Sequence, residues 1–171
     1  MRFRKDNLLF FQTLPKFALA TDNFEILPDT RAFRAKLFEL IESAQKRIYL
    51  SMLYLENDQS GQAVLHALYQ AKQDNPALDI KIFVDFHRAQ RGLIGEQKSA
   101  GNAGFYRQCQ QQYQHGIDIY GVPVKSKEVL GVLHLKGFIF DNTVLFSGAS
   151  INDIYLQQED RYRFDRYHVI N

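Results

Sequence analysis

Two basic side chains interrupt an otherwise apolar stretch in the last third of the chain. His134 and Lys136 stand two positions apart within residues 133–140, and residues two apart in a strand project from the same face. A buried histidine and lysine must be paired or solvated, so this placement favours a site for an anion. An imidazole can attack an electrophile or move a proton, and an ammonium can hold a negatively charged oxygen.

Further polar residues follow this pair at short spacing. Asp141 lies between two apolar runs, residues 133–140 and 143–147, and predicts the turn of a hairpin. Ser150 and Asn152 lie beyond the second run, again two positions apart, and both can donate hydrogen bonds to oxygens of an anion. We therefore expect the two strands of the hairpin to bring several polar groups together.

A nucleophilic histidine also needs a carboxylate or a carbonyl that fixes which ring nitrogen carries the proton. Asp141 has a structural explanation at the hairpin tip, at a distance from His134. The preferred partner is therefore Asp165, on the extended residues 162–170. The alternatives are Glu159 or Asp160 in the same role, and an ion pair of Asp165 with Arg163 or Arg166 at a strand edge.

The elements that must position these residues predict an α/β fold. Residues 28–30 resemble a helix start, and apolar residues then recur at helical spacing up to position 44. The order strand, helix, strand that follows implies a crossover unit with a parallel pair. The predicted elements are strand 47–54, helix 62–73, strand 80–84, loop 88–104, helix 103–114 and strand 117–122.

The predicted loop carries a second set of basic residues. It leaves the carboxyl end of a strand, where loops often bind ligands. Arg88 and Arg91 stand at its start, and arginine forks suit phosphate oxygens. The alternative is that both are solvated loop residues.

Bulk properties predict one domain, residues 1–171. A chain of 171 residues that is 46% hydrophobic can bury a core, and its net charge of +2 favours no nucleic-acid partner. Residues 1–20 form a basic and apolar segment that could rest on an anionic membrane surface, or whose apolar side could pack on the domain. No segment has the length of a membrane span or of a signal peptide, so we expect a cytoplasmic protein. The single cysteine and the lack of paired metal-ligand spacings predict neither a disulfide nor a metal or other cofactor.

His134-x-Lys136 with Asp141, Gly148 and Asn152 resembles the His-x-Lys-x4-Asp signature of the phospholipase D superfamily. Segments elsewhere resemble the bacterial phosphatidylserine synthases that use CDP-diacylglycerol. They are residues 53–58 (LYLEND), 84–92 (VDFHRAQRG), 120–123 (YGVP), 147–153 (SGASIND) and 160–168 (DRYRFDRYH). The resemblance implies a phospholipase D-like mixed sheet flanked by helices.

The resemblance also implies a reaction and its partners. CDP-diacylglycerol and L-serine would be the substrates, with a phosphatidyl-histidine intermediate, release of CMP and peripheral attachment to the inner membrane face. Two features depart from the family pattern: Ala149 stands where the superfamily usually has serine, and the chain has one His-x-Lys motif instead of two. The site would then need a second motif-bearing half, from another copy or from a longer chain. The alternatives are a homodimeric phosphodiesterase or nuclease, and an inactive fragment.

Overall fold

The fold is a single seven-stranded mixed sheet, seen in a computed structural model that describes residues 10–90, 101–124, 132–158, 160 and 162–171. The strand order is β1-β7-β6-β5-β2-β3-β4. β2, β3 and β4 run parallel to one another, and the remaining neighbours are antiparallel. The strands are β1 Phe24–Leu27, β2 Arg47–Ser51, β3 Asp79–Asp85, β4 Asp118–Val122, β5 Gly137–Phe140, β6 Thr143–Ser147 and β7 Tyr167–Ile170.

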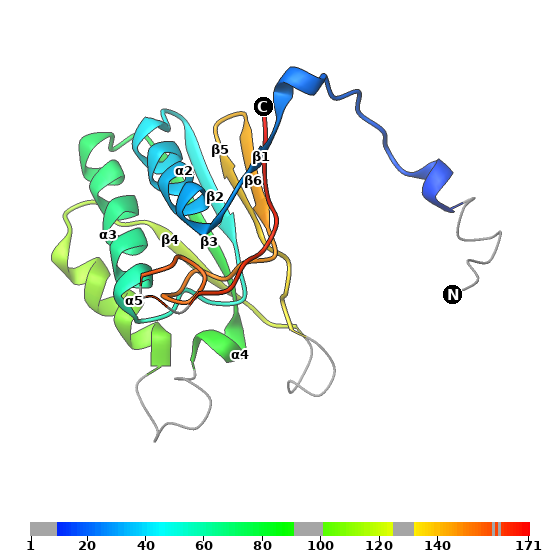
Figure 1. Cartoon of the computed structure of the whole chain (residues 1–171). Coiled ribbons are helices and arrows are strands. Elements are labelled where there is room, and N and C mark those ends of the chain that lie inside the picture. The colour runs from blue at the N-terminus through cyan, green and yellow to red at the C-terminus, as the bar shows by residue number, and fades with distance from the viewer. Residues whose placement is uncertain (1–9, 91–100, 125–131, 159, 161) are drawn as a thin grey trace.

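Three of the helices form a layer on one side of this sheet (Figure 1). They are α2 Thr30–Ser43, α3 Gln59–Asp74 and α5 Gly101–Gln112; the short η1 Thr21–Asn23 and α4 Phe86–Ala89 lie at the ends of strands. Asp29 and Asp58 cap α2 and α3 by accepting hydrogen bonds from Ala32 N and Gly61 N at 2.8 Å. Such caps satisfy backbone donors that a helix start leaves unpaired.

The core lies between the helical layer and one face of the sheet. Along β2 and β3 the alternate residues are buried against the helices, as for Leu50 and Ile82. Phe33 of α2 is fully buried and stacks on Tyr167 of β7 with ring centroids 4.6 Å apart. Alternation of this kind places every second side chain of the sheet in the core.

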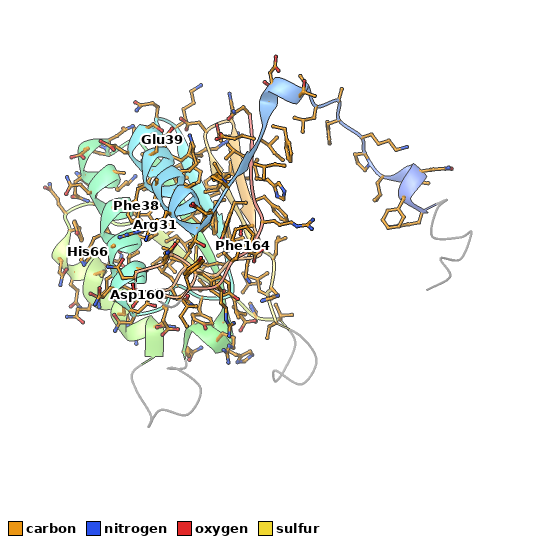
Figure 2. The ribbon with its side chains drawn as sticks, in the orientation of Figure 1. Arg31, Phe38, Glu39, His66, Asp160 and Phe164 are labelled. Carbon is orange, nitrogen blue, oxygen red and sulfur yellow. The ribbon has the colours of Figure 1, made fainter. Side chains whose placement is uncertain are left out.

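The other face of the sheet, which we call the open sheet face, carries no described helix. It exposes Phe24, Ile26, Ile139 and Phe146, and His168 stacks between Phe24 and Phe146 at 5.4 and 6.3 Å. Figure 2 marks the helical layer through the labelled side chains of Phe38, Glu39 and His66.

The segment before the sheet extends away from the domain. Residues 10–20 project from it as an arm (Figure 1), and every one of them is exposed, Phe17 by 91%. The alternative in which the apolar side of this segment packs on the domain is therefore wrong for residues 10–20. In the described part of the chain, no helix combines the length and apolarity that a membrane crossing requires.

The α/β class and the mixed sheet are confirmed, with shifts at the ends of elements. The strand expected at 47–54 ends at Ser51, the helix expected at 62–73 begins at its Asp58 cap, and the extended segment 162–170 forms a strand only from Tyr167. β1 and α4 were missed. The predicted loop 88–104 ends sooner than expected, because α5 begins at Gly101; residues 91–100 lie outside the described part.

Candidate active site

The His134 and Lys136 pair lies at the edge of the sheet where β2 and β3 end. Gly137 opens β5 opposite Ser51, the last residue of β2, so the two basic residues come just before the strand. The prediction that both lie on the strand is wrong. The backbone of the neighbouring residues instead bonds to side chains: Leu133 N donates to the Asp85 carboxylate, and the Ser51 hydroxyl donates to Leu135 O at 3.1 Å. The carboxyl edge of parallel strands is where α/β proteins commonly bind ligands.

Lys136 is buried with an exposed fraction of 7%. Its ammonium donates to the carbonyl oxygen of Gly148 at 2.5 Å. A lysine has three N–H donors, so two remain for a ligand. The carbonyl that holds this buried cation is neutral and does not cancel its positive charge. The ammonium is therefore suited to an anionic ligand.

Asp165 is brought to the same glycine. A Cβ at Gly148 would lie only 2.7 Å from Asp165 Oδ2, so the missing side chain leaves room for this carboxylate. Asp165 is held by its backbone N, which donates to the Tyr167 hydroxyl at 3.2 Å, and by Arg166 N, which donates to Asp165 Oδ1 at 2.7 Å. Lys136 and Asp165 therefore share Gly148 as a neighbour.

The His134 side chain is exposed, unlike that of Lys136. The two therefore do not share one face of a strand as the spacing predicted, because the chain at 132–136 leaves the regular pleat. Among the described residues, no hydrogen bond involves the His134 ring. Both nitrogens are open to a substrate or to a further protein group, and orientation of this ring by Asp165 stays a prediction.

Asp85 is the site residue that the sequence analysis missed. It is 1% exposed and accepts three backbone hydrogen bonds, from His87 N, Arg88 N and Leu133 N, at 2.9 to 3.0 Å. One carboxylate thus ties the start of α4 to the residue before His134. Its place after an apolar strand and before a helix start is the signal that could have identified it.

Ser150 and Asn152 lie on the return segment after β6, two and four residues beyond Gly148. Ser150 is 9% exposed. Asn152 Oδ1 accepts from Tyr155 N at 3.1 Å, which leaves its amide nitrogen as a donor. Asp58 and Asp153 clamp this segment to the start of α3, because Asp58 Oδ2 accepts from Asp153 N and Asp153 Oδ1 accepts from Ser60 N, both at 2.7 Å. Burial raises the pKa of Asp58.

Asp141 lies at the far end of β5, roughly 17 Å from Lys136 along an extended chain. Its carboxylate accepts from Gln45 N, Lys46 N and Arg47 N at 2.8 to 2.9 Å. Burial alone would raise its pKa, but the three backbone donors together lower it below its ordinary value. The structure therefore gives Asp141 a structural place and does not bring it to the other site residues.

Arg88 stands at the same edge as the site. Its guanidinium carbon lies 5.4 Å from the centre of the Tyr54 ring. Burial and Glu56 raise the pKa of Tyr54, and Arg88 opposes both effects. Arg91 lies outside the described residues. The Arg88 side chain thus lies over the Tyr54 ring, and its backbone N donates to Asp85 at the end of β3.

A mixed sheet with a buried lysine and a carboxylate at Gly148 and an exposed histidine nearby in the chain is an α/β domain whose sheet edge has the composition of an anion site. The comparisons identify the family. Residues 37–153 match the family described as cardiolipin synthase, PLD-like domain, and the chain belongs to that family.

Relatives and solved structures similar to this chain include phosphatidyltransferases. It is 49% identical over 160 residues to a CDP-diacylglycerol–serine O-phosphatidyltransferase of Haemophilus influenzae, covering 92% of this chain and 35% of that protein. It is 29% identical over 162 residues to a CDP-diacylglycerol–glycerol-3-phosphate 3-phosphatidyltransferase of Schizosaccharomyces pombe, covering 86% and 31%. The crystal structure of phosphatidylserine synthase from Haemophilus influenzae superposes with a TM-score of 0.91 at 44% identity, covering 99% of this chain and 38% of that one. The chain thus spans about a third of the length of these relatives.

Proposed function

We propose that this chain is one catalytic half of a phosphatidyltransferase that makes phosphatidylserine from CDP-diacylglycerol and L-serine. The observation that carries the proposal is the cluster at Gly148, whose carbonyl oxygen accepts from the buried Lys136 ammonium and whose missing side chain leaves room for the Asp165 carboxylate. His134 stands two residues before Lys136. The 49% identity to a phosphatidyltransferase over nearly the whole chain supports the choice of reaction.

The proposed chemistry is transfer of a phosphatidyl group through a histidine. An imidazole nitrogen, of His134 or of its counterpart in the second half, attacks the phosphorus, the bond to the CMP oxygen breaks, and the other histidine protonates CMP. The serine hydroxyl then attacks the phosphorus and gives its proton to that second histidine, while the phosphorus–nitrogen bond breaks and releases the first histidine. Lys136, Ser150 and Asn152 hold the non-bridging oxygens, and Asp165 orients the ring.

The donor substrate has broader support than the acceptor. The names of both relatives include CDP-diacylglycerol, whereas one names serine and the other glycerol 3-phosphate as acceptor. Higher identity to the serine enzyme favours serine. Arg88 follows the end of β3, where its backbone N donates to Asp85, and in this proposal its guanidinium and that of Arg91 hold the diphosphate of the donor. Asp141 acts in it as a residue that positions the strands.

A second motif-bearing half completes the proposed site. One His-x-Lys motif supplies only one of the two histidines that the reaction uses. The exposed His134 ring and the exposed apolar residues of the open sheet face, such as Phe146 and Ile139, support an arrangement in which another half covers this side. That half is either a second copy of this chain or a further part of a longer one.

The donor is a lipid, so the enzyme must reach a membrane surface. The arm at residues 10–20 exposes Phe10, Phe11 and Phe17 next to Lys16. Exposed aromatic and basic side chains suit the interface of an anionic membrane. We propose peripheral attachment at the inner membrane face through this arm.

The test is CMP release from CDP-diacylglycerol in detergent micelles, with and without L-serine, on a chain whose mass is measured by light scattering. Serine should raise the rate in an associated species, and Lys136→Met should lower it at least a hundredfold. His66→Gln is the matched control, because His66 bonds to Tyr113 on the helical layer, and should leave the rate unchanged. Absence of CMP release at every association state, or hydrolysis of DNA in its place, would reject the proposal.

A further inference from the structure

A cavity of about 410 Å³ lies beside the site and takes no part in the chemistry described above. Its floor is the sheet at β3 and β4, and its walls are α4 and α5. The lining residues used below are Val84, Phe86, Gln90, Arg107, Gln110 and Gly121. The volume falls in the range of roughly 300–1,000 Å³ that is typical of small-molecule sites.

The cavity combines one aromatic wall with a few polar groups. The Phe86 ring is 45% exposed and lies against Gly121, where a Cβ would come within 2.9 Å of Phe86 Cδ2. A glycine at this position therefore leaves room for the ring against β4. An exposed aromatic face next to a glycine suits stacking by a flat heterocycle.

The polar groups of the cavity can read the edge of such a ring. Gln90 Nε2 donates to Phe86 O at 3.1 Å, which leaves its amide oxygen as an acceptor. Arg107 makes no ion pair or hydrogen bond with a described residue. Gln110 adds a second carboxamide. A carboxamide supplies one acceptor and one donor side, which matches the amino group and ring nitrogen of cytosine.

The position of the cavity links it to the reacting centre. Phe86 follows Asp85 directly in the chain, and the Asp85 carboxylate holds Leu133 N at 2.9 Å, one residue before His134. A ligand stacked on Phe86 would thus lie next to Asp85, whose carboxylate holds the backbone segment that carries His134. A diphosphate is an extended group and can cross this interval.

We propose that the cavity binds the cytosine nucleotide end of the donor, with the base on Phe86 and Arg107 and the two carboxamides at its polar edge. The inference rests on the proposed function, since it assigns one part of that donor. The other parts of the substrates fit less well. The acyl chains remain in the bilayer and gain nothing from a guanidinium and two carboxamides, and serine is too small to fill the cavity.

Binding of free nucleotide tests the inference without turnover. The full chain is titrated with cytidine 5′-monophosphate, and amide shifts of α5 and β4 are followed by NMR. Phe86→Ala and Arg107→Gln should each weaken binding about tenfold, and uridine 5′-monophosphate should bind more weakly than the cytidine nucleotide. Gln108→Ala, at an exposed α5 residue outside the lining, is the control and should bind like the unaltered chain.

Each outcome separates this inference from the proposed function. Nucleotide binding that both lining variants weaken supports the cavity even if the chain shows no turnover. Unchanged affinity in both variants, or shifts of α5 and β4 caused by dihexanoyl phosphatidic acid and not by the nucleotide, overturns it even if CMP is released from CDP-diacylglycerol. Arg107 is exposed, so its variant should fold and keep the test valid.

Discussion

Asp141 and Asp165 show at the level of single residues how two carboxylates acquire different surroundings. The oxygens of Asp141 are occupied by three backbone donors ahead of β2. Asp165 instead uses Oδ1 for its neighbour Arg166 N and lies over Gly148, beside the group that holds Lys136. The hydrogen-bond partners of each carboxylate, and not its spacing from His134 in the sequence, show which one lies next to the residues that hold Lys136.

Substituting Asp141 should therefore lower stability without acting on the site directly. Asp141→Asn keeps one acceptor oxygen and tolerates the left-handed backbone, with φ of 51°, but loses the charge. We expect the free energy of unfolding to fall by about 1–2 kcal/mol, since hydrogen bonds to a charged group are strong but this one is partly solvated. Urea unfolding at neutral pH measures the change, and Asp22→Asn is a control at an exposed acid.

The same substitution should alter the acid dependence of stability. The pKa of Asp141 is lower in the folded chain than its ordinary value of 3.8. Its contribution is therefore complete above about pH 4 and is lost as the pH falls through the lower, folded value. The difference between the unaltered chain and Asp141→Asn should shrink on acidification in this window. If the difference in the free energy of unfolding between the two chains stays constant from about pH 6 down to acid unfolding, the lowered pKa of Asp141 is contradicted.

Asp85 acts between elements, because its carboxylate joins the end of β3, the start of α4 and the segment that carries His134. Asp85→Asn leaves one acceptor oxygen for three backbone donors. We expect a loss of about 2 kcal/mol in the free energy of unfolding and faster hydrogen exchange at the Leu133 amide. Asp79→Asn, at the other end of β3, is the control for the exchange measurement and should leave the Leu133 amide protected. If the Leu133 amide keeps its protection in Asp85→Asn, this tie is not what holds the segment.

Two glycines in different elements should respond in opposite ways to the same change. A Cβ at Gly61 in the first turn of α3 would lie 1.8 Å from Glu56 O, whereas one at Gly137 in β5 would meet nothing within 4 Å. Gly61→Ala should cost about 3 kcal/mol or more, because the clash is with backbone. Gly137→Ala should be neutral or slightly stabilising. Thermal unfolding of both variants measures the difference. Equal melting temperatures would contradict this account of the packing at the two glycines.

The sequence predicts the central elements well and their ends poorly. The periodicity of Phe33, Leu37 and Ile41 marks α2, and the alternation in residues 80–84 marks β3, because both patterns report burial on one face. β1 was not predicted because it has only four residues, FEIL, which is too short for a distinctive pattern. The start of β5 at Gly137 follows a segment held by the side chains of Ser51 and Asp85, which are remote in sequence.

The candidate site divides in the same way. His134 and Lys136 were identified from the sequence because charged residues inside an apolar run are conspicuous. Asp85 was missed because its role depends on Leu133, 48 residues further along the chain. The cavity at Phe86 was also out of reach of spacing arguments, since its walls come from four elements that only the folded sheet brings together.

On the scale of the whole molecule, the helices cover one side of the sheet and leave the open sheet face exposed (Figure 1). Ile26 and Phe146 are 65% and 47% exposed there, although both lie on regular strands. Apolar side chains gathered on one sheet face mark an interaction surface or an aggregation risk. The proposed second half gives this surface an occupant.

Charges placed on the open sheet face should therefore weaken association of the chain with another copy. We expect Ile26→Lys with Phe146→Lys to lower the mass measured by light scattering to that of one chain under conditions where the unaltered chain associates. Gln70→Lys adds a charge to the exposed side of α3 and should leave association unchanged, because the helical layer is not the contact. Equal loss of association in Gln70→Lys would show that net charge, and not the open sheet face, controls assembly. A doubly substituted chain that keeps its dimer mass and its folded spectrum would place the contact of the two halves elsewhere on the molecule.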